Sequence, residues 1–435
     1  PMPETPDKKS PQDLLDWLGI SDAPNWAVAQ WLARGFAASL FLLFALSYAA
    51  AFGIAGKVVF GGGEVTLGAG GLIAALLGAP FLIWGTILKH QTVRTQQEGH
   101  MTDRIAKAVE MLGTEKTDLR HEADDAGNLL RDKDGRLFAV ERTLANLEVR
   151  IGAILSLERI AQDSTTFDKG RDHVRVMEIL CTYIRENAPN SKPRETPRAD
   201  IETALQVLAR RTVQQRQIEF EWRNQENTQT DSPYMRSNIP TEKAGYLPWL
   251  QRIDRNLGYR LNLSSANLSG LFVKDGDFSN ALFNGTIFSR CTFTDTNFIG
   301  ANFYRSDFKG AKFFACNLDA CRISNTDLSG SSFYSGSINY ATLTKVELDN
   351  QTILLTSLRF TSIENSDLSK YSLTMEPISE SFGDSSVRLG LLKDQPIHWP
   401  RWKLGASSPL RFQEEVHKWR ENPDSYVRAP PPNGD

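Results

Sequence analysis

Cysteine and histidine are scarce in this chain of 435 residues, which has four cysteines and six histidines. The histidines are scattered without the spacing of metal ligands, and the motifs GxxxxGKS/T, GxSxG, HExxH and CxxC are missing. The low cysteine count suits a reducing compartment. The sequence therefore predicts no enzyme activity, no cofactor and no metal site.

A strong net charge is also missing, because 49 Lys and Arg nearly balance 52 Asp and Glu. A net charge of −3 creates no field that would direct the chain to nucleic acid or to anionic lipid. The turn Asp132-Lys-Asp-Gly135 resembles the start of a calcium loop, but Thr143 occupies the closing position, where such a loop needs Glu. We interpret it as a plain hairpin turn.

An apolar residue stands at every fifth position from Leu263 to Leu373 without interruption. A period of five fits neither a helix, at about 3.6 residues per turn, nor a flat strand, at about two. A chain that turns a corner every five residues explains it, with the central residue of each five pointing inward. The predicted structural core includes Phe278, Phe283, Phe288, Phe293, Phe298, Phe303, Phe308 and Phe313.

The position two before each centre is nearly always small, as a second inward position in a narrow core requires. Three of the cysteines, Cys291, Cys316 and Cys321, occupy this position. We interpret them as core residues rather than as metal ligands or disulfide partners.

Several repeats share a motif: Ala-Asn-Leu-Ser-Gly at 266–270, Ala-Asn-Phe-Tyr-Arg at 301–305 and Thr-Asp-Leu-Ser-Gly at 326–330. These motifs resemble the A(D/N)LXX signature of the pentapeptide repeat family. The resemblance implies a right-handed quadrilateral β-helix with four repeats per coil over residues 261–375. Residues one coil apart would then stack at about 4.8 Å, and the whole rod would be roughly 27 Å long.

Both ends of such a solenoid need a cap, because open strand edges invite further pairing. Residues 226–260 are predicted to form a linker and N-terminal cap, with 249–255 covering the first coil. Residues 376–435 are expected to form a C-terminal cap, with a short helix at 411–420 and a disordered Ala-Pro-Pro-Pro tail.

Two uncharged runs lie near the N-terminus, at residues 35–56 and 65–88. Each could cross a hydrocarbon core of about 30 Å, so we expect two transmembrane helices in a hairpin. Basic residues concentrate outside the connecting loop, which places both termini and the repeats in the cytoplasm by the positive-inside rule. The predicted location is thus the inner, cytoplasmic membrane.

Residues 1–34 combine a charged, proline-rich and disordered start with an apolar segment that contains Trp17, Trp26 and Trp31. Two interpretations of this segment stay open, an amphipathic helix at the membrane interface and a soluble capping helix.

Residues 89–225 show the apolar spacing of amphipathic helices, with turn clusters at 117–142 that predict a short β-hairpin insert. We expect a small α-helical, α-solenoid-like juxtamembrane domain. Stretches at 147–161, 176–180 and 200–211 are similar to the juxtamembrane region of bacterial membrane-anchored pentapeptide repeat proteins. That resemblance implies interaction rather than catalysis.

Apolar residues also follow some repeat centres, where they would face solvent and stack from coil to coil. Exposed stripes of this kind mark interfaces, although the chain's own tail, with Trp399, Trp402 and Leu410, is an alternative cover. The candidate interaction patch contains Phe314, Tyr334, Leu354, Leu355, Tyr340 and Phe360.

Three functions are compatible with these features, and we rank them in order. The first is a non-enzymatic, membrane-tethered scaffold that presents the β-helix to an unidentified protein partner. The second is a membrane-active effector or sensor whose hairpin forms a homo-oligomer through small residues. The third is a DNA mimic that protects gyrase, as some pentapeptide repeat proteins do.

The charge of the repeats argues against DNA mimicry. Residues 261–375 hold ten acidic and nine basic side chains, and a net charge of −1 does not imitate a polyphosphate. No nucleic-acid partner is expected.

Overall fold

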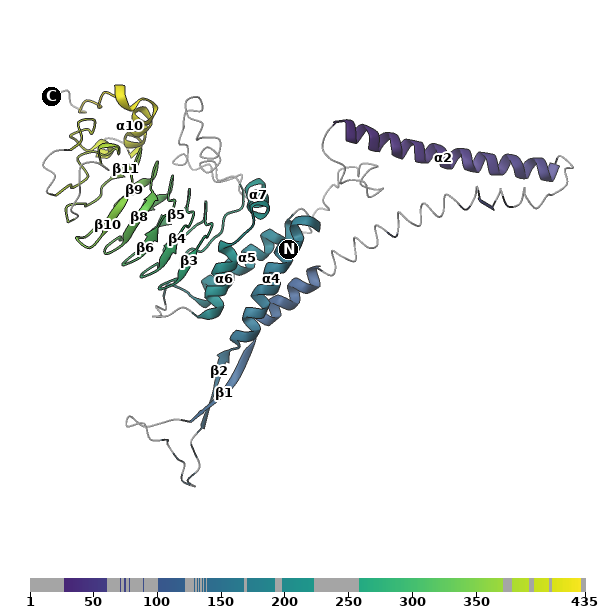
Figure 1. Ribbon diagram of the computed structural model, residues 1–435, viewed down its shortest axis with the longest axis horizontal. Helices are drawn as coiled ribbons and strands as arrows, with labels where there is room; N and C mark the ends of the chain where they lie inside the picture. The colour runs from purple at the N-terminus through teal and green to yellow at the C-terminus, as the bar shows by residue number, and fades with distance from the viewer. Residues whose placement is uncertain are drawn as a thin grey trace, which may run out of the picture. The chain divides into compact units, whose positions relative to one another are not determined.

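The computed structural model describes residues 27–60, 101–121, 139–167, 170–191, 198–222, 258–370, 378–390, 395–406 and 409–431, with isolated positions inside 71–89 and 129–137. The chain divides into two compact units, Pro1–Asp103 and Arg104–Asp435. Figure 1 labels their helices and strands. The predicted cap at 249–255 and the segment preceding residue 27 lie outside the described residues.

The first unit contains helix α2 (Ala27–Phe60), which is 34 residues long. In the part of the chain that the structure describes, no helix combines the length and the apolar character needed to cross a membrane. The transmembrane hairpin predicted at 35–56 and 65–88 is therefore wrong. The first uncharged run is not an element of its own, because α2 begins before Arg34 and continues past Lys57. The localisation derived from the hairpin stays a prediction.

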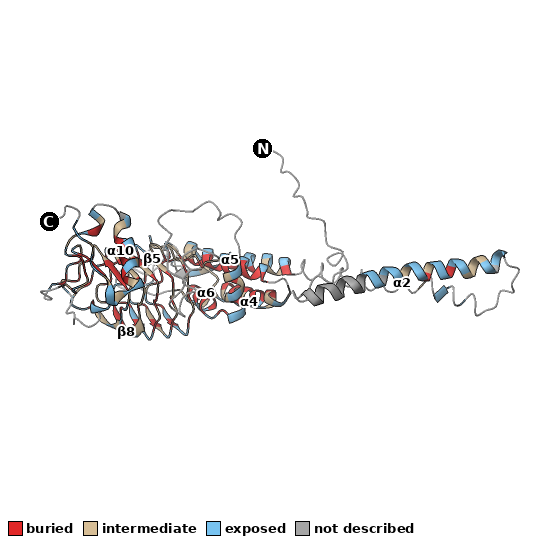
Figure 2. Cartoon of the chain, turned by 90° about the horizontal axis from the view of Figure 1, so that it is seen from above, coloured by how far each residue is buried: buried red, intermediate tan, exposed pale blue. Residues whose placement is uncertain are grey.

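In the second unit, helical residues 104–112 lead into an antiparallel ribbon of β1 (Glu115–His121) and β2 (Ala139–Ala145). The ribbon lies where turn clusters predict the hairpin insert. Four helices follow it: α4 (Leu147–Phe167), α5 (Arg171–Asn187), α6 (Ala199–Ala209) and α7 (Val213–Glu221). The first three pack together through buried side chains such as Leu157, Leu180 and Leu208, and Figure 2 shows these buried stripes in red.

Residues 258–370 wind into a four-sided solenoid, because parallel backbone ladders run along four separate sides of the coil. The predicted pentapeptide-repeat β-solenoid is thus confirmed. Two of the ladders are continuous sheets, and the other two consist of isolated bridges. The first sheet contains β3 (Phe272–Lys274), β4 (Thr292–Thr294), β6 (Lys312–Phe314), β8 (Ser332–Ser337) and β10 (Ile353–Ser357). The second contains β5 (Asn302–Tyr304), β7 (Arg322–Ser324), β9 (Thr342–Thr344) and β11 (Ser362–Glu364).

Stacked phenylalanine rings fill the first half of the solenoid interior. All eight predicted core phenylalanines are at most 1% exposed. The ring centroids of Phe283 and Phe303 lie 5.3 Å apart with an interplanar angle of 4°, and rings on adjacent sides meet edge to face. Both arrangements are favourable for aromatic rings. From Leu318 to Leu368 the centres are aliphatic except for Phe333, and they leave an apolar gap of about 20 Å³.

Each corner of the coil depends on two local features. The residue two after most centres has a left-handed backbone, with φ between 50° and 62° at non-glycine positions such as Asp275 and Asn280. The Asn or Asp one before the centre accepts a hydrogen bond from the backbone N–H two residues later, as Asp327 Oδ1 does from Ser329 N at 2.9 Å. This bond explains the Asn or Asp in the A(D/N)LXX motif.

The small inward residues also hold successive coils together. Several of them donate a side-chain hydrogen bond to the carbonyl of a core residue 23 positions earlier. The donor–acceptor pairs are Thr286 to Leu263, Cys291 to Leu268, Ser306 to Phe283 and Thr326 to Phe303. The hydroxyl and thiol groups of these four buried residues are therefore hydrogen-bonded, as burial requires.

The helical part of the second unit caps the first coil. The backbone N–H of Asn267 donates to Ala188 O at 2.6 Å, and the backbone N–H of Asp277 donates to Ala209 O at 2.9 Å. Arg211 adds a side-chain bond from Nη2 to Asp277 O at 2.6 Å. The open edge of the solenoid is thus paired by helix ends.

The solenoid continues beyond the last uninterrupted repeat. The sequence predicts irregular structure after Leu373, but Ile363 N donates to Phe382 O at 2.7 Å and Leu368 N donates to Arg388 O at 2.9 Å. Phe382 is fully buried and begins a second core cluster with Leu404, Phe412, Val416 and Trp419. Helix α10 (Pro409–Glu421) supplies three of these residues and closes this end of the coil.

Phe298 lies in contact with rings above, beside and below it, so its truncation leaves a cavity that rigid neighbours do not fill. We expect Phe298→Ala to lower the free energy of unfolding by about 3–5 kcal/mol. The matched variant Ile299→Ala, at the adjacent outward position, should cost less than about 1 kcal/mol. Urea unfolding measures both changes, and similar losses for the two variants would contradict the inward assignment.

Asp277 makes the capped coil sensitive to acid. Burial raises the pKa of its carboxyl group, but hydrogen bonds from Ser279 and the nearby charges of Arg211 and Arg216 hold the net pKa below 3.8. Because the folded-state pKa is lowered, the contribution to stability is present above the unfolded pKa and is lost as the pH falls through the folded value.

We therefore expect Asp277→Asn to be less stable than the natural chain at neutral pH, with the difference shrinking below about pH 4. Unfolding free energies measured from neutral to acidic pH test this. A difference that stays constant over the whole pH range would show that Asp277 acts without its charge.

Candidate functional site

Two columns of side chains flank the buried centres of the first sheet, and all of them except the buried Ser332 are at least partly exposed. The residues before the centres are Phe272, Thr292, Lys312, Ser332 and Ile353, and those after them are Lys274, Thr294, Phe314, Tyr334 and Leu355. The rings of Phe314 and Tyr334 stack with centroids 5.2 Å apart and planes 6° apart. Leu355 lies opposite Tyr334 and is 64% exposed. We call Phe314, Tyr334 and Leu355 the exposed stripe.

Both signs of charge occur near the exposed stripe, because Asp275 and Asp295 stand at the corner directly after β3 and β4, and the backbone N–H of Asp295 donates to Phe314 O. The five strands of the first sheet carry Lys274 and Lys312 and contain no Asp or Glu. Phe272, 52% exposed, adds a further apolar side chain at the N-terminal end of this side. The strands of this side are therefore apolar with two lysines, in a domain whose overall charge is close to neutral.

A register shift changes which leucine belongs to the stripe. Leu354 pairs with Phe333, whereas the repeats otherwise pair residues that are 20 positions apart in the sequence. The pairing of β10 is therefore shifted by one residue. Leu354 consequently lines the apolar gap in the core, and Leu355 takes the outward place next to Tyr334. The prediction that Leu354 continues the stack on Tyr334 is wrong by this one residue.

The shift begins because Gln351 is too large for the small inward position that the period of five assigns to it. Thr352 takes that position instead, 3% exposed, and donates to Leu328 O, which lies 24 rather than 23 residues earlier. The carboxylate of Asp349 holds the wider turn by accepting from Gly330 N at 2.8 Å and from Gln351 N at 3.1 Å.

Strand β8 restores the register within the same side of the coil. The stretch from Tyr334 to Ser337 in β8 is one residue longer than the opposite stretch from Leu355 to Ser357 in β10. Ser357 therefore pairs with Ser337 again. Gly336 lies in this bulge, where a Cβ atom would approach the carbonyl oxygen of Cys316 to 2.2 Å. Only glycine fits this bulge without a backbone shift.

The other half of the predicted patch is covered by the chain itself. Tyr340 and Phe360 stack with centroids 4.9 Å apart, and the Trp419 ring lies 5.6 Å from Phe360. Arg420 lies over the Tyr340 ring and donates from Nε to Phe360 O at 2.8 Å. Helix α10 therefore covers this pair.

The tail residues proposed as a cover lie elsewhere. Trp399 is fully buried and donates from Nε1 to Ser381 O at 2.8 Å, and Trp402 packs against the second core cluster. Leu410 is 46% exposed. The indole ring that packs against Phe360 is that of Trp419.

The buried thiols and the buried histidine of the second unit are structural. Burial raises the pKa of Cys181 and Cys291 to about 12 and that of Cys316 to about 11, so these thiols stay neutral and unreactive. His173 is fully buried and bonded at both ring nitrogens, to Glu219 at 2.7 Å and to Gln215 at 3.3 Å. Among the described residues, no group of His, Cys, Asp or Glu could hold a metal ion.

The model of one protein family, the pentapeptide repeat region, matches residues 286–363. This part of the chain is similar to a pentapeptide repeat region. It contains strands β4 to β10 and all three residues of the exposed stripe. No curated protein sequence matches the chain significantly.

Several solved structures of pentapeptide repeat proteins are similar to parts of the chain. One from the thylakoid lumen of Arabidopsis thaliana is 26% identical with a TM-score of 0.17, over 25% of this chain and 70% of that chain. Rfr23 from the cyanobacterium Cyanothece 51142 is 14% identical with a TM-score of 0.18, over 29% and 90%. Full-length QnrB1, a plasmid-mediated fluoroquinolone resistance protein, is 14% identical with a TM-score of 0.15, over 30% and 92%.

Another side of the pentapeptide repeat region carries an acidic column. Asp307, Asp327, Glu347 and Asp367 follow one another along its bridge ladder. Two of these carboxylates form ion pairs, Asp327 with Lys309 at 3.0 Å and Asp367 with Arg388 at 3.6 Å. The column is thus partly neutralised and differs from the uninterrupted charge of a phosphate backbone.

Gly336 offers a test of the register repair beside the exposed stripe. We expect Gly336→Ala to lower the free energy of unfolding by about 1–3 kcal/mol, because the added methyl group collides with the Cys316 carbonyl. Gly152→Ala in helix α4 is the control, since no atom lies within 4 Å of its added Cβ. Urea unfolding of both variants decides the matter, and equal stability of the two would rule out the clash.

Proposed function

We propose that the chain is a non-enzymatic interaction scaffold, in which the pentapeptide repeat region presents the exposed stripe to a protein partner. The single observation that carries this proposal is the contrast between two stacked aromatic pairs. Tyr340 and Phe360 are covered by Trp419 and Arg420 of helix α10, whereas Phe314 remains 36% exposed.

The covered pair shows what kind of contact suits such a stack on this solenoid. An indole packs against the outer ring, and a cation binds both the ring face and the backbone carbonyls at the corner. The exposed stripe offers the same kind of ring surface, extended by the aliphatic side chain of Leu355. Aromatic side chains of this kind dominate the binding energy of protein interfaces.

The charges around the stripe favour a partner of complementary character. Lys274 and Lys312 lie on the same side as the stripe, and the strands there contain no carboxylate. A partner segment with an aromatic or aliphatic anchor and flanking Asp or Glu would therefore fit, because opposite charges at the rim steer association and suppress other partners.

The solenoid also reduces the entropic cost of binding. Strands β6 and β8 each pair with a strand on both sides, and β10 pairs with β8 and places Leu354 in the core. The stripe is therefore ordered before a partner arrives. Preorganised side chains lose less freedom on association than side chains on loops.

Site-specific photo-crosslinking in the cells that produce the protein tests this proposal. A photoreactive residue at Thr294, next to Phe314 in the same column, should yield a discrete crosslinked protein. The same residue at Thr344, the equivalent position on the second sheet, should not. Identical products from both sites, or no product from Thr294, would refute the assignment of the partner to the stripe.

The energetic test uses the partner found by that crosslink. Replacing Phe314 and Tyr334 together by Ser should weaken binding by about 30-fold or more, corresponding to at least about 2 kcal/mol. Tyr304→Ser removes another exposed ring on the second sheet and should change affinity less than two-fold. Equal effects of both changes would contradict the stripe, and a crosslinked second copy of the chain would assign it to a homo-oligomer.

A further inference from the structure

Residues 426–431, which we call the proline segment, show a burial pattern with a period of three. Tyr426 and Ala429 are half-buried, whereas the two residues after each of them are exposed. Tyr426 has φ −63° and ψ 123°. A polyproline II helix has about three residues per turn and similar dihedral angles. The side chains of the proline segment therefore form three ridges, of which one packs on the protein and two face solvent.

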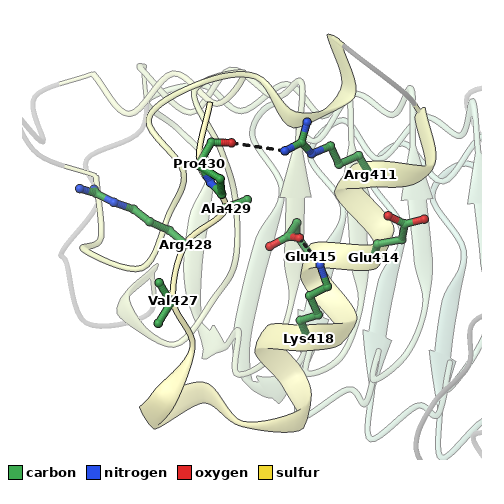
Figure 3. A pocket seen from close by; sticks show the side chains of 8 residues that line it. All are labelled: Arg411, Glu414, Glu415, Lys418, Val427, Arg428, Ala429 and Pro430. Atoms are coloured by element: carbon green, nitrogen blue, oxygen red, sulfur yellow. Dashed lines mark hydrogen bonds and ion pairs between the residues drawn. The ribbon is translucent and has the colours of Figure 1, made fainter. Parts of the chain in front are cut away.

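The buried ridge is held by specific contacts with the C-terminal cap. Tyr426 donates from its hydroxyl to Glu415 Oε2 at 2.7 Å, and Trp402 donates from Nε1 to Ala429 O at 3.2 Å. Arg411 donates from Nη2 to Pro430 O at 3.3 Å, as Figure 3 shows, and also lies over the Trp402 ring. Two of these bonds accept at backbone carbonyls, so they fix the course of the chain without using its side chains.

The two outer ridges carry apolar and basic side chains. Val427, 85% exposed, and Pro430 form one ridge, and Arg428 and Pro431 form the other. In Figure 3 the Arg428 side chain points away from helix α10. A hollow of about 540 Å³ between α10 and the proline segment is lined by charged residues that include Glu414 and Lys418.

We propose that the proline segment is a docking ligand for a protein domain that binds polyproline II helices. Such a domain would place Val427 and Pro430 in a groove of aromatic side chains and would bind Arg428 with a carboxylate. This inference concerns a surface separate from the exposed stripe and does not rest on the function proposed for it.

Two properties of the segment support this partner class. A polyproline II helix makes no internal hydrogen bonds, so a backbone carbonyl that the cap does not already bond is available to Trp and Tyr donors of a groove. Trp402 already makes this kind of bond to Ala429 within the chain. The contacts of Tyr426, Ala429 and Pro430 with the cap also order the segment in advance, which lowers the entropic cost of docking.

Isotope-labelled SH3-class domains that accept arginine-flanked proline ligands are the probes for this proposal. They are titrated with the full chain while their NMR spectra are recorded. We expect saturable binding with a micromolar Kd for at least one domain of a panel with different acidic pockets, and shifts confined to its aromatic groove. Binding should weaken at least ten-fold in the double variant Pro430→Ala with Pro431→Ala, and likewise in Arg428→Glu.

Ile397→Ala is the matched control, because Ile397 is 91% exposed on the same cap and outside the proline segment. The alanine substitutions leave the carbonyls of residues 429 and 430 in place, so equal melting temperatures should accompany the lost binding. Absence of saturable binding across the panel, or equal binding by all variants, would overturn the proposal. Self-association that the double variant abolishes would overturn it too, since a second copy would then be the occupant.

Discussion

The narrow interior of the solenoid is the constraint on which the rest of the second unit depends. Hydrogen-bonded coils lie about 4.8 Å apart, so side chains one coil apart are forced into contact. Phenylalanine rings satisfy this spacing by stacking, as Phe288 and Phe308 do at 5.0 Å. The small inward residues leave room for these rings and at the same time bond the next coil through hydroxyl or thiol groups. The distance between successive side chains in every outward column is therefore set by this core.

The period of five predicted a corner every five residues and the inward centres, and the four-sided winding was implied by the resemblance of the motifs to the pentapeptide repeat family. The hydrogen-bonding role of the small positions was missed, although the frequent Thr and Ser there were a visible sign. Gln351 was the sign of the register shift, since it breaks the small pattern. The last coil escaped notice because Phe382 stands one residue before the place that the period assigns to it.

Features that depend on contacts distant in sequence could not be read from local patterns. The helical cap binds the first coil largely through backbone groups, such as Ala188 O and Ala209 O, which leave no trace in residue identity. The candidate patch was predicted residue by residue, but its division into an exposed and a covered half follows from the docking of α10. The uncharged runs suggested membrane spans because charge alone was considered, whereas the first of them is part of the longer helix α2. Proline-rich composition suggested a disordered tail, yet Trp402 and Arg411 bind its carbonyls.

The repair of the extra residue at 349–352 has an evolutionary consequence. Register is lost at one corner and recovered at Ser357, so the next centres, Leu358, Ile363 and Leu368, keep their places. The longer corner is offset by a shorter stretch in β10, so the shift of one residue is confined to one side of the coil. A corner of the coil can thus gain or lose a residue without displacing the other sides. The outward side chains on each of the four sides can therefore vary independently and bind different partners.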